Sequence, residues 1–483
     1  MSVHFPAVHP RPPAHWINDP NGLVFHDGHY HVFFQYNPAS TRHENVHWGH
    51  YRSRDLVRWE RLPVALAPSD EDSGGVWSGN AVSDGGRLVA FYSARREDRW
   101  WQPVASAVSR DGGLTFAKDP GLRVAEPPPN AVMFRDPYVW RDGDRWRMLV
   151  GAALRDGRGA ALHYLSDDLE TWKYTGPFLA RAPEPLPGGT TERGWECVQY
   201  ADFGDGRGAL LLSAWDPDEG ARRTAVYTGA DHGESFAAGA PARLDHGPDF
   251  YAPALLRAPD GRWLLWAWSW EARDAVRPGA PSTWTDEAGW AGLLTLPREV
   301  TPDGHGCVVQ RPAREIAALR GAAVVTARGR AAACVPRDLG AVGRCLDVTA
   351  RLHRSPDGRA AAGLRLLTSS DGDEYLDVGL DPATGELVAD RSRASREPRA
   401  QGGSWRIPRP VAPGAAADVR IIVDHSIAEI FLGTGEALTL RFYPVGDGPW
   451  RLRARAAGAG SAAFDVRAWP LRPAETEDAC GPS

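Results

Sequence analysis

Residues 19–36 read DPNGLVFHDGHYHVFFQY: an acidic start, a short apolar run, an Asp-Gly turn and a second apolar run. Alternating apolar residues on both sides of such a turn are typical of a β-hairpin. The pattern recurs four more times, as WSGNAVSDGGRLVAFYSA from Trp77, DPYVWRDGDRWRMLVGAA from Asp136, ECVQYADFGDGRGALLLSAW from Glu196 and DFYAPALLRAPDGRWLLWAW from Asp249. The chain therefore contains five copies of one hairpin, with a period of roughly 60 residues.

A shorter signature follows four of these copies and predicts a second hairpin in each period. It reads SRDLVRW from Ser53, SRDGGLTF from Ser109, SDDLETW from Ser166 and, less clearly, GADHGESF from Gly229. Each of these stretches predicts a turn that leads into an outer strand. Two hairpins per period make a four-stranded blade, so five periods predict an all-β fold that begins with a five-bladed β-propeller.

The character of the sequence changes after the fifth copy. GWAGLLTLPREV, residues 289–300, is expected to supply the strand that completes the fifth blade, and RPAREIAALR, residues 311–320, could form a short helix between two bodies. Beyond it, alternating Ala-rich strands with polar turns predict a β-sandwich. We therefore divide the chain into a propeller domain (1–310), a linker (311–321) and a sandwich domain (322–483).

Asp19, Asp136 and Glu196 open the first, third and fourth copies. Equivalent positions of successive blades converge on the central channel of a propeller, so we expect these three side chains around one funnel. Like charges held together raise some of their pKa values, which is typical of active sites. In the first copy, Pro20 and the following Asn-Gly also predict a turn that holds Asp19 at a bend.

Several motifs resemble those of glycoside hydrolase family 32, the β-fructosidases. WINDPNG at 16–22, FRDP at 134–137 and Glu196-Cys197 match the three acid-bearing motifs of the family, with Ile17 where Met is usual. FQYNP at 34–38, WSG at 77–79, DFYA at 249–252 and VDHSIAEIFL at 423–432 match further family motifs. The resemblance covers nearly the whole chain.

This resemblance implies a retaining hydrolase that cleaves terminal β-fructofuranosyl bonds, in sucrose or short fructo-oligosaccharides, through a covalent fructosyl-enzyme intermediate. Asp19 would be the nucleophile, Glu196 the general acid/base, and Asp136 the residue that holds fructose hydroxyls and stabilises the transition state. Arg135 is expected to favour the ionised form of Asp136. The candidate substrate-binding residues are Asn18, Gln35, Trp48, Trp77, Ser78, Arg135, Cys197 and His43.

Other activities remain open at this point. A fructosyltransferase would use the same residues, an inverting arabinan or xylan hydrolase also has a five-bladed propeller with three acids, and a propeller lectin would bind sugars without cleaving them. Many family members carry a Trp eight or nine residues after the Gln of FQYNP, where this chain has His43 and Glu44. The preferred fructoside is therefore open among sucrose, sucrose phosphate, inulin and levan.

Composition excludes several function classes. A net charge of −6 without a basic cluster argues against nucleic acid, and no apolar run is long enough for a membrane span. We expect a cytoplasmic monomer or homodimer that acts on a small carbohydrate without a cofactor. The five cysteines are dispersed and predict reduced thiols.

Two sets of histidines suggest a metal site but fit it poorly. His43-Glu44-Asn45-Val46-His47 spells H-E-x-x-H, a zinc motif that requires a helix, whereas this stretch lies inside a β-repeat. His26, His29 and His31 are expected on the solvated face of a hairpin. We therefore predict no metal.

Overall fold

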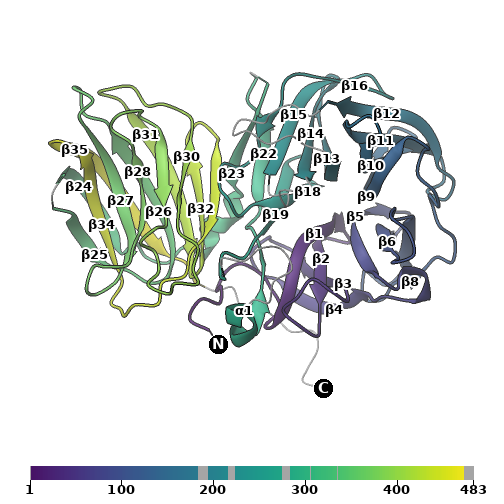
Figure 1. Cartoon of the computed structure of the whole chain (residues 1–483), viewed down its shortest axis with the longest axis horizontal. Helices are drawn as coiled ribbons and strands as arrows, with labels where there is room; N and C mark the ends of the chain where they lie inside the picture. The colour runs from purple at the N-terminus through teal and green to yellow at the C-terminus, as the bar shows by residue number, and fades with distance from the viewer. Residues whose placement is uncertain are drawn as a thin grey trace.

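The structure, a computed structural model, describes residues 2–182, 194–215, 223–274, 283–304, 306–333 and 335–472. Within these ranges the chain is nearly all β. The helical elements there are α1 (Thr283–Ala288) and two 3-10 helices, Asp70–Asp72 and Arg314–Leu319, the second of which lies in the predicted linker. The strands form two groups, and the chain passes from the first to the second near residue 313 (Figure 1).

The N-terminal group contains five sheets that follow one another along the chain. Each predicted hairpin forms the first two strands of one sheet, so the repeat is confirmed. The first two sheets comprise β1 (His15–His26), β2 (His29–Asn37), β3 (His47–Ser53), β4 (Glu60–Leu66), then β5 (Gly75–Asp84), β6 (Arg87–Arg95), β7 (Val104–Ser109) and β8 (Ala117–Lys118).

The third sheet comprises β9 (Ala131–Asp142), β10 (Arg145–Leu154), β11 (Gly159–Ser166) and β12 (Lys173–Arg181). The fourth comprises β13 (Gly194–Gly204), β14 (Arg207–Trp215), β15 (Arg223–Asp231), β16 (Phe236–Ala238) and β17 (Ala242–Arg243). The fifth comprises β18 (Tyr251–Arg257), β19 (Trp263–Ser269), β21 (Leu293–Leu294), β22 (Arg298–Pro302) and β23 (Val308–Pro312). The predicted outer strands are confirmed as β4, β8, β12 and β16.

The first strands of the five sheets lie next to one another in a closed ring. β1 contacts β5, β5 contacts β9, β9 contacts β13, β13 contacts β18, and β18 contacts β1 again. In Figure 1 these strands line the centre of the N-terminal group. Residues at the start of each repeat are therefore brought together although they lie far apart in the sequence.

The segment 289–300 was expected to supply the strand that completes the fifth blade, and its later part does join the fifth sheet, but its first part does not. Its first part, β20 (Trp290–Ala291), pairs in parallel with β1 in the first sheet, and only β21 and β22 join the fifth. Two glycines with positive φ, Gly289 at 74° and Gly292 at 80°, bend the chain on either side of β20. The last repeat thus supplies a strand that joins the fifth sheet to the first.

The C-terminal group contains two six-stranded sheets that share one apolar core. One consists of β24 (Val325–Ala332), β35 (Ser461–Pro470), β26 (Cys345–His353), β31 (Ala416–Asp424), β32 (Ile427–Leu432) and β33 (Ala437–Arg441). The other consists of β25 (Arg337–Ala341), β34 (Arg451–Gly458), β27 (Ala360–Thr368), β28 (Leu376–Leu380), β29 (Leu387–Asp390) and β30 (Ser404–Ile407). Inward-facing Leu, Ile and Val side chains alternate with outward polar ones along these strands.

A buried network of charged side chains connects the two groups. His9 bonds through Nδ1 to Asp424 Oδ2 at 2.7 Å and through Nε2 to Glu429 Oε1 at 3.0 Å. Arg298 of β22 donates to Glu429 Oε2 at 2.6 Å and to Asp245 Oδ2 at 2.9 Å. The two acids from the VDHSIAEIFL motif therefore pair with cations that lie in the N-terminal part of the chain.

The histidines of the first hairpin are not all solvated, contrary to the prediction. His29 is partly exposed, but His26 and His31 are buried. His26 Nδ1 lies 2.8 Å from Ser83 Oγ of the second sheet, and His31 Nδ1 lies 2.9 Å from His50 Nε2. The hairpin packs against its neighbouring sheet, which removes two of the three rings from water.

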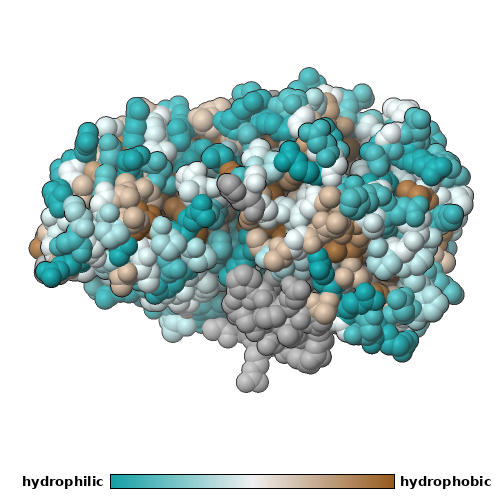
Figure 2. Space-filling model, turned by 90° about the horizontal axis from the view of Figure 1, so that it is seen from above, coloured by the Kyte–Doolittle hydropathy of each residue, from teal (hydrophilic) through white to brown (hydrophobic). Residues whose placement is uncertain are grey.

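The surface shown in Figure 2 is mainly hydrophilic, with hydrophobic atoms in small groups between charged ones. Among the described residues, no helix is long and apolar enough to cross a membrane.

Candidate active site

Each of the five innermost strands is irregular at the point where its repeat begins. The pairing register skips residues 18–19 in β1, 77–78 in β5, 136 in β9, 197–198 in β13 and 252–253 in β18. Such β-bulges redirect side chains that would otherwise alternate across a sheet, and they are common beside active sites. Asp19 therefore lies in a bulge within β1, not in the turn that its Pro-Asn-Gly neighbours predict.

Asp19 is surrounded by hydrogen-bond donors. Ser78 Oγ donates to Asp19 Oδ2 at 2.6 Å, Asn18 Nδ2 donates to Oδ1 at 3.1 Å, and Gln35 Nε2 lies 3.4 Å from Oδ2. Burial, with a smaller effect from the charge of Glu196, raises the pKa of Asp19 to about 6, although the bonds from Ser78 and Asn18 oppose the shift. The carboxylate is thus fixed in place by neutral groups, and none of the described cations forms an ion pair with it.

Glu196 is held by two donors of a different kind. Arg135 donates through Nη2 to Oε1, and the Tyr251 hydroxyl donates to Oε2. The Arg135 guanidinium also lies over the Trp215 ring, 5.2 Å from its centre. Arg135 was expected beside Asp136, but the structure pairs it with Glu196, because the bulge at Asp136 points adjacent side chains in different directions.

Asp136 is buried and its backbone adopts φ of 62°, a left-handed conformation that is uncommon for a residue with a side chain. Its N–H donates to Ser93 Oγ at 2.7 Å, and the N–H of Cys197 donates to its Oδ2 at 3.0 Å. Burial raises the pKa of Asp136 to about 7. Arg135 favours the ionised form, as predicted, but burial and the charges of Glu196 and Asp19 outweigh it.

Cys197 joins the aspartates. Its Sγ lies 3.6 Å from Asp19 Oδ2 and also 3.6 Å from Asp136 Oδ2. Burial and the three nearby carboxylates raise the pKa of the thiol well above its ordinary value, so it stays protonated. Asp19, Asp136 and Glu196, which belong to three different sheets, thus converge around one thiol, as the repeat predicts.

Aromatic rings line the same site. Trp16, Trp268 and Trp270 form a cluster with Tyr251 and Cys197. His43 lies beside this cluster, with its ring centre 6.0 Å from that of Trp16 and 5.2 Å from that of Trp77. Sequence reasoning did not single out Trp16, Ser93, Tyr251 or Trp268 as site residues. Trp16 and Tyr251 stand within matched motifs, but Ser93 and Trp268 carry no such signal.

One of the candidate binding residues does not reach the site surface. Trp48 is fully buried, and its indole N–H donates to the backbone oxygen of Trp77 at 3.1 Å. The prediction that it contacts substrate is therefore wrong, because its ring lies behind Trp77 in the core between the first two sheets. It supports the residue that faces the site.

The H-E-x-x-H stretch has no helical structure. Residues 43–46 form a bend and loop, and His47 begins β3. His43 Nε2 contacts Gln35 Oε1, whereas His47 Nδ1 contacts the backbone oxygen of Asn45. In the part of the chain that the structure describes, no three His, Cys, Asp or Glu side chains are grouped so as to hold a metal ion.

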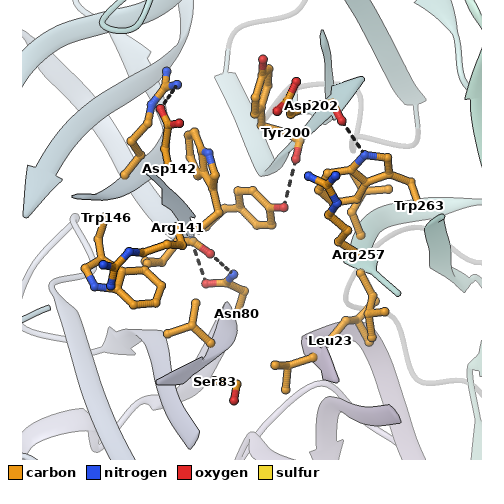
Figure 3. Close-up of a pocket in the computed structure, with 18 of the residues that line it drawn as sticks. Leu23, Asn80, Ser83, Arg141, Asp142, Trp146, Tyr200, Asp202, Arg257 and Trp263 are labelled. Carbon is orange, nitrogen blue, oxygen red and sulfur yellow. Dashed lines mark hydrogen bonds and ion pairs between the residues drawn. The ribbon is translucent and has the colours of Figure 1, made fainter. Parts of the chain in front are cut away.

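A cavity of about 620 Å³ lies at the other end of the innermost strands (Figure 3). Its lining includes Arg141, Trp146, Arg257 and Trp263. Asp142 of β9, also in this lining, is six residues beyond Asp136, or about 20 Å along a strand. The lining extends from there back to Asn80 and Tyr138, two residues beyond Ser78 and Asp136, and none of the three acids belongs to it.

The ring of sheets holds three carboxyl groups in one site lined by aromatic rings. Such a site is typical of enzymes that cleave glycosidic bonds with a pair of acids. Residues 9–312 match the model of the "Glycosyl hydrolases family 32 N-terminal domain", and residues 315–470 match that of the "Glycosyl hydrolases family 32 C terminal". The chain belongs to glycoside hydrolase family 32.

Similar proteins agree with this assignment. A sucrose-6-phosphate hydrolase of Escherichia coli is 32% identical over 92% of this chain and 90% of its own length. A raffinose invertase of Escherichia coli is 36% identical over 65% of this chain and 66% of its own length. The solved structure of a β-fructofuranosidase from Bombyx mori has a TM-score of 0.79 and 26% identity, and the match covers 98% of this chain and 95% of that one.

Proposed function

We infer that the protein is a retaining β-fructofuranosidase that hydrolyses terminal β-fructofuranosyl bonds in sucrose or short fructo-oligosaccharides. The observation that carries this inference is the contrast between two acids of one site. Asp19 receives hydrogen bonds from neutral groups, whereas Glu196 is bound by Arg135 and Tyr251. Two acids in different environments can divide the roles of nucleophile and acid/base between them.

In the first step, Asp19 attacks the anomeric carbon of fructose while Glu196 gives its proton to the departing oxygen. The bond between the anomeric carbon and that oxygen breaks, and a bond to the Asp19 carboxylate forms. Arg135 and Tyr251 then stabilise the new Glu196 carboxylate. In the second step, Glu196 takes a proton from water, and the resulting hydroxide displaces fructose from Asp19.

Asp136 has a separate role in this proposal. Its carboxylate, fixed by the backbone N–H of Cys197, accepts hydrogen bonds from fructose hydroxyls and stabilises positive charge on the sugar ring in the transition state. Asn18, Gln35 and Ser78 hold Asp19 and line the fructose pocket together with Trp77 and His43.

The proton content of the site fits this cycle. Among the described residues, Arg135 is the cation that pairs with one of the three carboxyl groups, and the pKa values of Asp19 and Asp136 are raised to about 6 and about 7. The three carboxyl groups, taken together, therefore retain a proton close to neutral pH. The proposed reaction requires that proton on Glu196 and requires Asp19 to be ionised.

We also propose that the five N-terminal sheets are the blades of a β-propeller over residues 1–310 and that residues 322–483 form a β-sandwich. The closed ring of innermost strands and the core shared by the two C-terminal sheets support this description. A cytoplasmic location is proposed as well, supported by the free thiols Cys197, Cys307 and Cys345 among the described residues. A monomeric or homodimeric state stays a prediction.

The test combines product analysis with two variants. Incubation with sucrose, sucrose phosphate, inulin and levan should release fructose, and NMR of the first product should show retention at the anomeric carbon. Asp19→Ala should abolish turnover. Glu196→Ala should lower kcat on sucrose by about 10² to 10⁴-fold, but far less on a fructoside whose leaving group needs no proton. Inverted product would rule out the double displacement, and transfer to a second sugar would identify a fructosyltransferase.

A further inference from the structure

Gln35 lies at the centre of the bonds that fix Asp19. The side chain is 2% exposed, and each end of its amide has two partners. Oε1 accepts from Asn18 Nδ2 at 2.8 Å and faces His43 Nε2 at 3.1 Å. Nε2 donates to Ser78 Oγ and lies 3.4 Å from Asp19 Oδ2. The orientation of this one amide therefore decides whether a donor or an acceptor faces the nucleophile.

His43 is one of the two groups that hold the acceptor end. Because Oε1 of Gln35 can only accept, the ring of His43 must carry its proton on Nε2 and donate there. The ring is flanked edge-on by Trp16 and Trp77. The His43 side chain is itself exposed. Partial desolvation by these surroundings lowers its pKa, with Glu196 and Arg135 acting in opposite directions. The ring is thus neutral near physiological pH and acts by hydrogen bonding.

We propose that His43 is a positioning residue that locks the Gln35 amide so that its NH2 group faces Ser78 and Asp19. A reversed amide would direct NH2 at the donors of Asn18 and His43 and would present an oxygen to the Asp19 carboxylate. This inference rests on the proposed role of Asp19 as nucleophile. It assigns a function to the position at which this chain departs from the Trp common in the family.

The consequence is a change in the acidity of Asp19. Without the His43 donor, Asn18 alone holds the acceptor end of the amide, and a fraction of Gln35 side chains reverses. Each reversal removes an N–H from the carboxylate, so the pKa of Asp19 rises.

The other titratable and charged groups that face Asp19 stay in place in such a variant. Within the described ranges they are Asp136 and Arg135 from β9, Glu196 and Cys197 from β13, and Tyr251 from β18. From β5, Ser78 faces Asp19 as a neutral donor.

Two substitutions separate the hydrogen bond from the ring. His43→Phe keeps an aromatic ring between Trp16 and Trp77 but has no donor. His43→Gln loses the ring but can place an N–H near the position of Nε2. The Asp19 carboxyl is titrated by ¹³C NMR in the sugar-free protein, with its signal assigned from Asp19→Asn, and kcat and KM for sucrose are measured from pH 4.5 to 8.

We expect His43→Phe to raise the pKa of Asp19 by about half a unit and to lower kcat by about three- to tenfold. His43→Gln should leave the pKa of Asp19 close to that of the wild type, and any change in its kcat or KM reports the loss of the ring from the sugar pocket. An unchanged Asp19 titration in His43→Phe, with only KM altered, would overturn the proposal and leave His43 as a wall of the sugar pocket. Equal shifts in both variants would overturn it too. The titration needs no turnover, so a wild-type protein that shows the expected titrations but releases no fructose would refute the proposed function alone.

Discussion

Among the described residues, Ser78 makes the shortest hydrogen bond to Asp19, at 2.6 Å. A hydroxyl that donates to a carboxylate stabilises the ionised form and lowers the pKa. In Asp19 this effect opposes burial, and the balance leaves a pKa of about 6. A nucleophile must be ionised, so we expect kcat/KM to fall as the pH drops below about 6.

Ser78→Ala should therefore move the acid limb of kcat/KM to higher pH. The change removes the donor, the pKa of Asp19 rises, and a smaller fraction is ionised at any pH near 6. The basic limb should stay in place, because no other acid of the site bonds to Ser78 Oγ among the described residues. An acid limb that stays at its wild-type pH would show that Ser78 does not tune Asp19.

Tyr251 provides a second test at the level of a single residue. Its hydroxyl donates to Glu196 Oε2, so Tyr251→Phe removes one of the two groups that stabilise the carboxylate after proton transfer. We expect kcat on sucrose to fall by about 10- to 100-fold, the usual value of a bond to a charged group. A fructoside with a leaving group that needs no proton is the internal control. An equal loss on both substrates would place the effect of Tyr251 elsewhere.

The three acids could be predicted at this scale because they stand at equivalent positions of a repeat. Their partners could not. Arg135 is adjacent to Asp136 in the sequence yet bonds to Glu196 from another sheet, and Ser93 reaches the backbone of Asp136 from β6 without any motif. Such contacts depend on side-chain directions that a strand pattern alone does not define.

At the scale of strands, bulges create the site. Regular alternation along β1 or β9 would place neighbouring side chains on opposite faces of a sheet. The bulges in all five innermost strands interrupt this alternation and direct the neighbouring side chains into the centre of the ring. The hairpins themselves were predictable from turn residues and apolar runs, but the bulges were not, because Asp-Pro and Asn-Gly read equally well as a turn.

Ring closure by β20 yields a prediction with a matched control. A Cβ on Gly292 would lie 1.9 Å from the backbone oxygen of Ile17, and its φ is 80°. Gly292→Ala should lower the free energy of unfolding by roughly several kcal/mol, because the backbone of β20 or β1 must shift to make room for the new methyl group. Gly289→Ala has a similar φ of 74° but open space around the Cβ, so it should cost only about 1 kcal/mol.

Chemical unfolding of both variants measures the difference in stability. Because Ile17 is next to Asn18 and Asp19, Gly292→Ala should also lower kcat where the protein remains folded, whereas Gly289→Ala should not. Equal stability of the two variants would contradict the idea that β20 closes tightly on β1.

At the scale of the whole molecule, the C-terminal part is joined to the ring of sheets by buried charges. The VDHSIAEIFL motif contains no residue that reaches the active site, and its acids Asp424 and Glu429 bind His9 and Arg298 instead. The motif could be identified from the sequence, but its structural role could not, because the cations that bond to its two acids lie more than a hundred positions away in the chain. Burying charges is costly, and removing one partner leaves the others uncompensated.

This network makes stability depend on pH in a defined direction. Hydrogen bonds and charge from Asp424 and Glu429 overcome the effect of burial and raise the pKa of His9 to about 9, from 6.5 in an unfolded chain. The folded protein therefore binds this proton more tightly, so the contribution of His9 is complete below pH 6.5 and is lost as the pH rises through 9. The difference corresponds to about 3 kcal/mol.

His9→Gln should accordingly lower the free energy of unfolding by about 3 kcal/mol at pH 6, and by progressively less as the pH approaches 9.5. His232→Gln, the same change at an exposed position, should have little effect at any pH. Urea unfolding of the wild type and both variants between pH 6 and 9.5 provides the measurement. Burial lowers the pKa values of His31 and His50, so their contribution to stability is lost as the pH falls. This contribution is the same in the wild type and the variant, so it cancels in the difference between their free energies of unfolding. If the His9→Gln deficit stayed constant from pH 6 to 9.5, the ring would not be protonated in the fold, and the two parts of the molecule would be joined by neutral hydrogen bonds instead.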